Sequence, residues 1–360
     1  METLSPPFDL LVLGQGFAGS ALALQAHWAG YRVGVVDDGQ PQSASRLSSG
    51  LLNPIILRRR RMVDNALVRW ETADAYYRKC EHLLGRPLFY REPVAELITT
   101  PEIDHAWTHL AERDAFQSLM EERTTSHSYQ GLKSCRLGTV KASGRLDSPA
   151  YLHAVRSFFE EKGQFSGERC QHIGPAKDNT WVTDTGWSAP VVLLAQGYPA
   201  QLTESLFGSL EFLPARGEGL VVRLPYLQLD RPIHGSFFLI PLTNKPEQFL
   251  VGATFAWDAI DSPQPTSLGR ATLIKWLESV LTPAALEGLE ILDQWSGVRP
   301  TRQDREPVAR WHPEKKGLGI LNGMGSRGGL LAPSLALGLL QEGVRQGYLP
   351  SPLEPKGITK

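Results

Sequence analysis

The chain has 360 residues, 42% of them apolar, which is enough for one large domain or two intertwined ones with a substantial core. Its 37 Lys and Arg nearly balance 38 Asp and Glu, so no overall basic field exists to attract nucleic acid or an anionic membrane. Three widely spaced cysteines without a CxxC pair argue against a disulfide framework or a metal site. The N-terminus lacks a secretory pattern, and no stretch approaches ~18 apolar residues. We therefore expect a soluble cytoplasmic protein.

The first predicted element is a β-α-β unit over residues 9–37. An apolar strand over residues 9–13 runs into a Gly turn, and a helix over residues 17–29 leads to a second strand over residues 31–36. In such a unit the helix N-terminus turns unpaired N–H groups and the positive end of its dipole toward a phosphate. The order of elements therefore predicts a dinucleotide site.

Three glycines and one acid have the spacing of a dinucleotide fingerprint. Gly14 permits the turn, Gly16 lets the backbone approach a pyrophosphate, and Gly19 packs the helix against the strand. Asp37 ends the second strand, where a carboxylate can accept hydrogen bonds from ribose hydroxyls. A purely structural Gly-rich turn is the alternative, and the unit does not distinguish NAD from FAD. The candidate contacts are Gly14, Gly16, Phe17, Ala18, Gly19, Asp37 and Asp38.

A loop of small residues over positions 43–51 follows the β-α-β unit. Small side chains let the main chain run against a flat ligand and donate hydrogen bonds to it, which suits a flavin. A flexible Ser-rich loop without a ligand is the alternative. The candidate contacts are Ser45, Arg46, Ser49, Gly50 and Leu51.

The run from Arg58 to Arg61 precedes a helix predicted over residues 66–85. Clustered arginines can contact the phosphates of FAD or of an RNA. The alternative is a solvated turn, which the near-neutral net charge and the lack of interleaved aromatic residues favour.

The middle of the chain changes from helix to strands. A helix is predicted over residues 148–163, capped by Ser148, stopped by Gly163, and apolar at helical spacing. Apolar or alternating runs within residues 210–224, 235–242 and 248–257 predict a sheet.

Two blocks near the C-terminus contain most of the remaining chemistry. Residues 296–311 read SGVRPTRQDREPVARW and hold four arginines with only Asp304 and Glu306 to offset them. Residues 317–333 read GLGILNGMGSRGGLLAP, a Gly-rich turn leading into a predicted helix whose N–H groups could stabilise negative charge. A Gly-rich helix start without a ligand is the alternative for the second block.

Together these blocks resemble the D-amino-acid-oxidase-like (DAO) family of FAD-dependent oxidoreductases. That family includes glycine oxidase, sarcosine oxidase and the oxidase half of the bifunctional tRNA wobble-uridine enzyme, and the first and last of these look nearest. The matching blocks are ASRLSSGLL, VVLLAQGYPA, FLVGATF, SGVRPTRQDREP and GLGILNGMGSRGGLLAP, which follow the family order over nearly the whole chain.

The resemblance implies an α/β fold in which a Rossmann-like FAD-binding domain is joined to a second domain with a mixed or antiparallel sheet that binds substrate. We expect the FAD-binding domain over residues 1–85, 144–200 and 297–345. The substrate domain then takes residues 86–143 and 201–296, and residues 346–360 form a frayed tail. No cysteine follows Cys170, so the covalent cysteinyl link of the sarcosine-oxidase branch has no candidate, and noncovalent FAD is expected.

The resemblance also assigns roles to single residues. Arg299 matches the position that binds the substrate carboxylate in glycine oxidase; an arginine satisfying loop carbonyls is the alternative. Arg302 is the second candidate, and Arg327 could add charge or face the substrate. Further candidate contacts of the flavin are Ala195, Gly197, Gly325, Ser326, Arg327, Gly328, Gly329 and Leu330.

The expected activity is oxidation of the C–N bond of a small amino acid or secondary amine to an imine that water then hydrolyses. One alternative is oxidative removal of a carboxymethyl group from a tRNA wobble uridine, with tRNA as partner. Another is a flavin-binding protein without turnover. The sequence gives neither the electron acceptor nor the oligomeric state.

Overall fold

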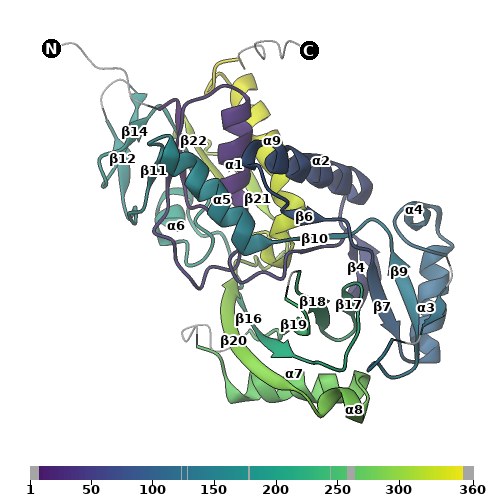
Figure 1. Cartoon of the computed structure of the whole chain (residues 1–360). Coiled ribbons are helices and arrows are strands. Elements are labelled where there is room, and N and C mark those ends of the chain that lie inside the picture. Colours follow the sequence, from purple (N-terminus) through teal and green to yellow (C-terminus); the bar gives the residue numbers. More distant parts are fainter. Residues whose placement is uncertain are drawn as a thin grey trace.

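The computed structural model describes residues 8–122, 124–127, 129–176, 179–243, 245–257 and 264–351. Figure 1 shows two bodies, one above the other, with the first and last described residues in the upper body. A six-stranded sheet forms the upper body and an eight-stranded sheet the lower one. This mixed α/β architecture confirms the predicted fold class.

The helices that frame these sheets have the following bounds. They are α1 (Phe17–Trp28), α2 (Ala66–Leu84), α3 (Pro101–Ala111), α4 (Asp114–Gln117), α5 (Ser148–Glu161), α6 (Gln201–Phe207), α7 (Ser267–Val280), α8 (Pro283–Leu286) and α9 (Gly328–Arg345). Two short 3₁₀ helices are η1 (Leu57–Arg59) and η3 (Gly325–Arg327).

The strands are short and come from all parts of the chain. They are β1 (Leu10–Leu13), β2 (Val33–Val36), β3 (Leu51–Leu52), β4 (Ile55–Ile56), β5 (Arg61–Met62), β6 (Phe89–Tyr90), β7 (Val94–Ile98), β8 (Thr125–His127), β9 (Cys135–Val140), β10 (Gly144–Leu146), β11 (Phe165–Ser166), β12 (Ile173–Pro175), β13 (Trp181–Thr183), β14 (Ser188–Ala189), β15 (Val191–Leu194), β16 (Ala215–Arg223), β17 (Ile233–His234), β18 (Phe238–Pro241), β19 (Gln248–Gly252), β20 (Glu290–Arg299), β21 (Val308–Trp311) and β22 (Leu318–Asn322).

The six-stranded sheet has the order β11-β2-β1-β15-β22-β21 and is parallel except for β21. Its central strands are entirely buried, because helices cover one face and the small β12-β13-β14 sheet packs near the other. The carboxyl ends of β1, β2 and β15 consequently lie at one edge, where α/β sheets bind ligands.

The eight-stranded sheet has the order β20-β16-β19-β18-β17-β7-β9-β8. The face away from the upper body packs on α7 and α8, which Figure 1 shows beneath it, around a second apolar core. Opposed residues share a face of a sheet. One register row crosses six strands through Trp295, Gly219, Gly252, Phe238, His234 and Glu96.

A three-stranded sheet of order β3-β10-β6 and the β4-β5 hairpin connect the two bodies. The hairpin turn contains Arg60, whose guanidinium donates to both carboxylate oxygens of Glu96 at 2.9 and 2.8 Å. Glu96 is buried in β7, so this ion pair ties the arginine run to the eight-stranded sheet. One arginine of the run therefore has a structural partner, while Arg59 and Arg61 are exposed.

One sequence-based detail is wrong. The N-cap of α5 is Asp147 rather than Ser148, since the Asp147 carboxylate accepts a hydrogen bond from the Ala150 N–H at 3.1 Å. Ser148 is the first helical residue and is buried. Gly163 has a φ of 66° and follows the helix end as expected.

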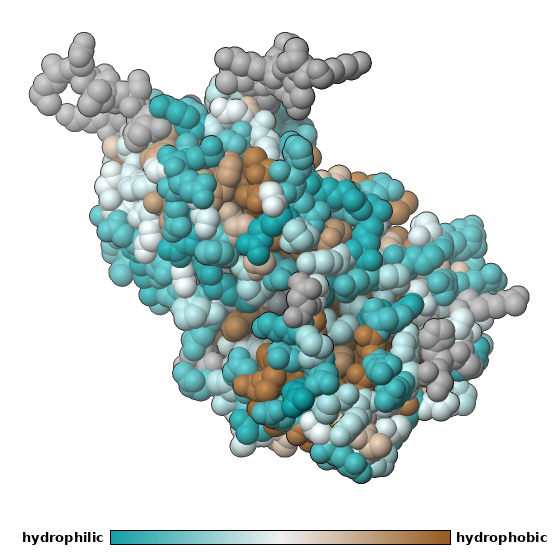
Figure 2. All heavy atoms as spheres, in the orientation of Figure 1, coloured by the Kyte–Doolittle hydropathy of each residue, from teal (hydrophilic) through white to brown (hydrophobic). Residues whose placement is uncertain are grey.

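The division into domains stays a prediction, and residues 352–360 of the expected tail lie outside the described residues. Among the residues that the structure describes, none of the helices is long and apolar enough to span a bilayer. Within that same part of the chain, no group of three or more His, Cys, Asp or Glu could hold a metal ion. Figure 2 shows a face on which hydrophobic side chains reach the surface in separate patches among hydrophilic ones.

The Arg60–Glu96 pair yields a stability prediction. Burial raises the pKa of Glu96 even with Arg60 beside it, so Arg60→Ala leaves a buried carboxylate that is harder still to ionise. We expect Arg60→Ala to lower the free energy of unfolding by about 2 kcal/mol at pH 8. Because a raised pKa in the folded state costs stability as the pH rises, the loss should be smaller at pH 5. Urea unfolding at the two pH values measures both.

Arg223→Ala is the matched control, because Arg223 pairs with Glu247 on the exposed surface and should contribute about 0–1 kcal/mol at either pH. Equal losses for the two variants, or a loss for Arg60→Ala that is larger at pH 5, would contradict the structural role assigned to the pair.

Candidate functional site

A cavity of about 630 Å³ is lined by residues of both bodies. On the upper body its wall consists of the N-terminus of α1, the end of β2, the Ser-rich loop and the residues after β15. On the lower body the wall is formed by β16, β18 and β20. The cavity therefore joins the predicted dinucleotide site to the sheet predicted to bind substrate.

The glycine fingerprint has the local geometry that the sequence predicts. Gly14 has a φ of 97°, and a Cβ added at Gly19 would come within 1.7 Å of the Gly14 carbonyl oxygen, so the helix packs directly on the turn. The N-cap residue of α1, Gly16, has no side chain to cap the helix, and only the Phe17 N–H is taken up by the Ser45 hydroxyl. The remaining N–H groups of the first turn and the positive dipole end are therefore available to the cavity.

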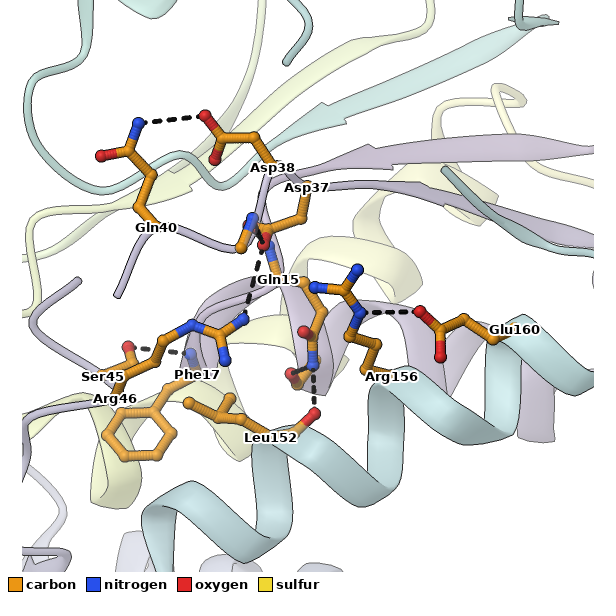
Figure 3. A network of polar contacts seen from close by, with 12 residues as sticks. Gln15, Phe17, Asp37, Asp38, Gln40, Ser45, Arg46, Leu152, Arg156 and Glu160 are labelled. Carbon is orange, nitrogen blue, oxygen red and sulfur yellow. Dashed lines mark hydrogen bonds and ion pairs between the residues drawn. The ribbon is translucent and has the colours of Figure 1, made fainter. Parts of the chain in front are cut away.

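Asp37 is held in place by the backbone around it (Figure 3). Its carboxylate accepts hydrogen bonds from the N–H groups of Gln15 at 2.7 Å and Gly39 at 2.8 Å, and Arg46 lies 3.7 Å away. These contacts fix the carboxylate at the end of β2, where it lines the cavity. Arg46 brings the Ser-rich loop to the same point.

The Ser-rich loop contacts the glycine turn. The Ser45 hydroxyl accepts a hydrogen bond from the Phe17 N–H at 3.1 Å and lies against Gly16 (Figure 3). The loop thus runs along the N-terminus of α1 rather than extending freely into solvent. Its residues from Ser43 to Ser49 line the cavity.

Arg299 lines the cavity from the lower body, at the end of β20. A Cβ added at Gly217 would fall 2.2 Å from the Arg299 guanidinium, so only glycine leaves room for it. The Arg299 Cζ atom lies over the Phe255 ring, 5.1 Å from its centroid, and the Thr254 carbonyl accepts a hydrogen bond from the guanidinium at 3.3 Å. Burial lowers the pKa of Arg299 to about 10, which leaves it charged at neutral pH. Among the described residues it has no carboxylate partner.

The lower-body wall of the cavity contains aromatic residues beside Arg299. Phe238 and Trp295 line it there, whereas the acidic residues of the lining, Asp37, Asp38 and Glu168, come from the upper body. Phe238 and Trp295 come from the register row that crosses the lower sheet. A ligand against this wall therefore meets the Arg299 cation and two aromatic side chains.

Arg302 and Arg327 point elsewhere. The Arg302 guanidinium donates to the carbonyls of Leu210 at 2.9 Å and Glu306 at 3.3 Å, and it pairs with Asp304 at 2.9 Å. Arg327 donates to the Arg305 carbonyl at 3.1 Å. Neither Arg302 nor Arg327 belongs to the cavity lining. Of the three arginines predicted to contact substrate, Arg299 alone lines the cavity.

The structure brings most, but not all, predicted site residues together. Those that line the cavity are Gly14, Gly16, Phe17, Ala18, Asp37, Asp38, Ser45, Arg46, Ser49, Ala195, Gly197, Arg299, Gly325, Ser326 and Gly328. Those outside the lining are Gly19, Gly50, Leu51, Arg302, Arg327, Gly329 and Leu330.

The residues outside the lining support those within it. Gly50 accepts a hydrogen bond from the Leu146 N–H at 2.9 Å, and Leu51 belongs to β3. The Gly329 carbonyl accepts a hydrogen bond from the Tyr77 hydroxyl at 2.7 Å, and Leu330 is buried in the core. They position the loop and the start of α9.

Sequence reasoning missed several lining residues. Glu168, Arg169 and Cys170 follow β11, which pairs with β2 through the register of Ser166 with Val36. No local motif marks these residues, because only the strand pairing brings them beside Asp37. Gly217, Phe238 and Trp295 were likewise part of predicted strands or flanks without an assigned role.

The donor set fits FAD. The N-terminus of α1 at Gly16, where the N-cap residue has no side chain, suits a pyrophosphate. The fixed Asp37 carboxylate suits a ribose, and the aromatic residues Phe238 and Trp295 in the wall suit a flat ring system. The cavity is continuous from one of these regions to the next.

Comparisons with known proteins agree with this geometry. The glycine oxidase of Geobacillus kaustophilus (strain HTA426) is 23% identical, with 98% of this chain and 97% of the relative covered. The crystal structure of glycine oxidase from Geobacillus kaustophilus superposes with a TM-score of 0.75 at 21% identity, covering 98% of each chain. The iminodiacetate oxidase of Chelativorans sp. BNC1 reaches 0.74 at 16% identity, covering 96% of this chain and 97% of that one.

A family model described as FAD dependent oxidoreductase (DAO) matches residues 9–340, which is most of the 360-residue chain. The match includes the glycine turn, the Arg299 region and the start of α9. The chain belongs to the DAO family of FAD-dependent oxidoreductases, as its sequence blocks predict, and is an FAD-dependent enzyme that acts on amino acids or amines.

Proposed function

We propose that the protein oxidises the C–N bond of a small amino acid or secondary amine that carries a carboxylate, giving an imine that water hydrolyses. The observation that carries this proposal is the half-buried guanidinium of Arg299, which lines the cavity without a carboxylate partner among the described residues. A partly buried cation without a counter-ion is costly, so an anionic ligand is its expected partner. A carboxylate accepts both arms of a guanidinium and is thereby oriented.

The reaction needs orientation more than proton transfer by the protein. Bound FAD supplies the two-electron acceptor that takes up the hydride from the carbon next to nitrogen. Arg299 holds the substrate carboxylate, so that carbon is fixed relative to the flavin. The aromatic side chains of Phe238 and Trp295 in the lower-body wall offer the ligand an apolar surface beside Arg299.

No described residue at the Arg299 end of the lining is an acid, a histidine or a lysine. The substrate therefore reacts as the uncharged amine, which loses its N–H proton to solvent as the imine forms. Water then adds to the imine carbon, and the carbonyl product and the smaller amine separate.

The start of α9 is proposed to stabilise the reduced cofactor. Gly325, Ser326 and Gly328 line the cavity immediately before or at the first turn of a helix of 18 residues. No side chain caps this helix, so its N–H groups and positive dipole end are available for negative charge.

FAD is proposed to bind noncovalently. Of the three cysteines, Cys170 alone belongs to the cavity lining, and burial raises the pKa of its thiol to about 12, which keeps it protonated. It lies beside Glu168 and Arg169 at the dinucleotide end, away from Arg299. Denaturation should release the flavin from the protein.

The substrate class is tested by anaerobic titration of the FAD-loaded protein with glycine, sarcosine, D-amino acids, L-proline, iminodiacetate and tRNA that carries a carboxymethylaminomethyl wobble base. Bleaching of the flavin by amines that carry a carboxylate, but not by the matching amines without one, is the expected result. If only tRNA that carries a carboxymethylaminomethyl wobble base bleached the flavin, the substrate would be tRNA and not a small molecule. No bleaching by any of them would contradict the proposal.

Gly16→Val tests the proposed pyrophosphate contact. The backbone at Gly16 is extended and accepts a valine, but the new side chain enters the cavity at the N-terminus of α1 against Ser45. We expect roughly 10- to 100-fold weaker FAD binding, corresponding to the loss of hydrogen bonds to a charged group. Flavin fluorescence titration of the apoprotein measures it.

Gly174→Val is the control, because nothing lies within 4 Å of a Cβ added there in β12. It should bind FAD as the unmodified protein does. Equal FAD affinity in both variants would place the pyrophosphate elsewhere.

Arg299→Met separates function from structure. It removes the proposed carboxylate ligand, so kcat/KM should fall about 100-fold or more. It also removes a buried charge without a carboxylate partner, so the free energy of unfolding should stay the same or rise. An arginine with a purely structural role would give the opposite pattern, with lower stability and nearly unchanged kinetics. Steady-state kinetics and urea unfolding of the same preparation decide between them.

Phe255 is proposed to position the Arg299 guanidinium, because its ring packs on the cation opposite Gly217. Phe255→Ala should raise KM about 5-fold, in line with one cation–π contact, and change kcat less. Phe255→Tyr should restore KM, and Tyr226→Ala, which removes another exposed aromatic ring, should leave it unchanged. A fall in kcat alone would show that Phe255 acts on another step.

A further inference from the structure

Three glycines lie next to one another on one face of the lower sheet. Gly217 and Gly219 are two positions apart in β16 and therefore share a face. Gly252 in β19 is the register partner of Gly219, which places it on the same face. Side chains from neighbouring strands can therefore lie against the backbone at these three points.

The Arg299 guanidinium and the Trp295 indole cover two of the glycines, and both line the cavity. A Cβ added at Gly217 would lie 2.2 to 2.4 Å from three atoms of the guanidinium, so this planar group lies flat across that position. A Cβ added at Gly219 would lie 2.1 Å from the indole. The guanidinium and the indole are therefore about 7 Å apart, twice the rise of one residue in a strand. One small ligand can contact both.

The Phe238 ring adjoins the indole and also lines the cavity. A Cβ added at Gly252 would lie 3.2 Å from the Cζ atom at the tip of this ring. Opposed residues of neighbouring strands have Cβ atoms about 5 Å apart, so the Phe238 and Trp295 rings approach each other to a similar distance. We name Trp295 and Phe238 the aromatic surface. It begins beside the cation and continues across the sheet.

The arrangement fixes what a ligand of Arg299 meets next. A carboxylate accepts hydrogen bonds in the plane of a guanidinium, and the Arg299 guanidinium lies flat on the sheet. The carbon atoms attached to that carboxylate therefore lie close to the aromatic surface, which offers them apolar area and carries no charge. Glycine has no side chain to cover this area, whereas an apolar substituent removes it from water.

We propose that the substrate carries an aryl group or a longer alkyl group on its nitrogen or its α-carbon, which packs on Trp295 and Phe238 while Arg299 holds the carboxylate. This inference rests on the proposed function and narrows its substrate class from small amino acids and amines in general to those with such a group. Arg299 then fixes the orientation of the substrate, and the aromatic surface determines its specificity.

Ligand binding to the FAD-loaded protein tests the inference without turnover. Carboxylates that bind beside a flavin perturb its absorbance, and titration gives their dissociation constants. Acetate, butyrate and phenylacetate increase in apolar area, and 3-hydroxypropionate is butyrate with a hydroxyl in place of the terminal methyl group. We expect phenylacetate to bind roughly 10-fold or more tightly than acetate, because burial of apolar area favours the larger ligand. Butyrate should bind more tightly than 3-hydroxypropionate for the same reason.

Trp295→Ala identifies the residue responsible, because it removes the ring that covers Gly219. The ratio of acetate to phenylacetate dissociation constants should fall about 5-fold, in line with the loss of one aromatic contact. Trp295→Phe should keep most of the ratio. Phe238→Ala should lower it in the same direction, and it keeps the test valid if Trp295→Ala does not fold. Leu292→Ala is the control, because it removes an exposed apolar side chain of β20 outside the cavity lining and should leave the ratio unchanged.

The outcomes separate this inference from the proposed function. If acetate and phenylacetate bind equally and amines bleach the flavin, the inference is wrong and the proposed function stands. Equal weakening of all carboxylates in Trp295→Ala would also overturn it, because the ring would then act through the cofactor or the fold. Anaerobic bleaching gives a second readout, in which N-benzylglycine should reach half-saturation at a lower concentration than sarcosine. If no carboxylate perturbs the flavin and no amine bleaches it, both fail.

Discussion

A half-buried guanidinium without a carboxylate partner among the described residues is the constraint on which the site depends. Arg299 ends β20, so its place is set by the pairing of that strand with β16 through nine residue pairs. Gly217 leaves room for it on one side, Phe255 covers it on the other, and Thr254 accepts one hydrogen bond. These contacts fix the cation but do not neutralise it. A site of this kind is stabilised by its ligand, and the protein without ligand tolerates the cost because the rest of the sheet is well packed.

The same cavity is built from segments that are far apart in the sequence. The glycine turn after β1 and the Ser-rich loop form one end, residues after β11 and β15 complete it, and β16, β18 and β20 supply the other. Asp37 and Arg46 join two of these segments, and Arg60 and Glu96 join the two bodies. Cofactor and substrate regions are thus held in a fixed relation by polar contacts between elements, which is what transfer of a hydride across a short gap requires.

Local motifs predicted one end of the site and little of the other. The turn at Gly14, the packing at Gly19 and the helix that follows depend on residues within a few positions of one another, so their sequence pattern was sufficient, and the fold class and FAD family are confirmed. The environment of Arg299 depends on its pairing with Ala215, which lies 84 positions earlier in the chain. No local sequence pattern encodes such a contact. For the same reason the sequence did not identify Cys170 and Trp295 as cavity residues. The N-cap of α5 was a separate, local error, because Ser148 was chosen in place of the adjacent Asp147.

Arginines that the sequence alone does not distinguish have different environments in the structure. Arg60 pairs with Glu96, and Arg302 pairs with Asp304 and donates to loop carbonyls, whereas Arg299 donates to the Thr254 carbonyl and has no carboxylate partner among the described residues. The most direct measurement of the central claim is a crystal structure of the FAD-loaded protein with a carboxylate that the enzyme cannot oxidise. We predict both carboxylate oxygens within hydrogen-bonding distance of the Arg299 guanidinium, with the ligand between it and the flavin ring. A carboxylate bound elsewhere, with Arg299 satisfied by protein groups alone, would contradict the account.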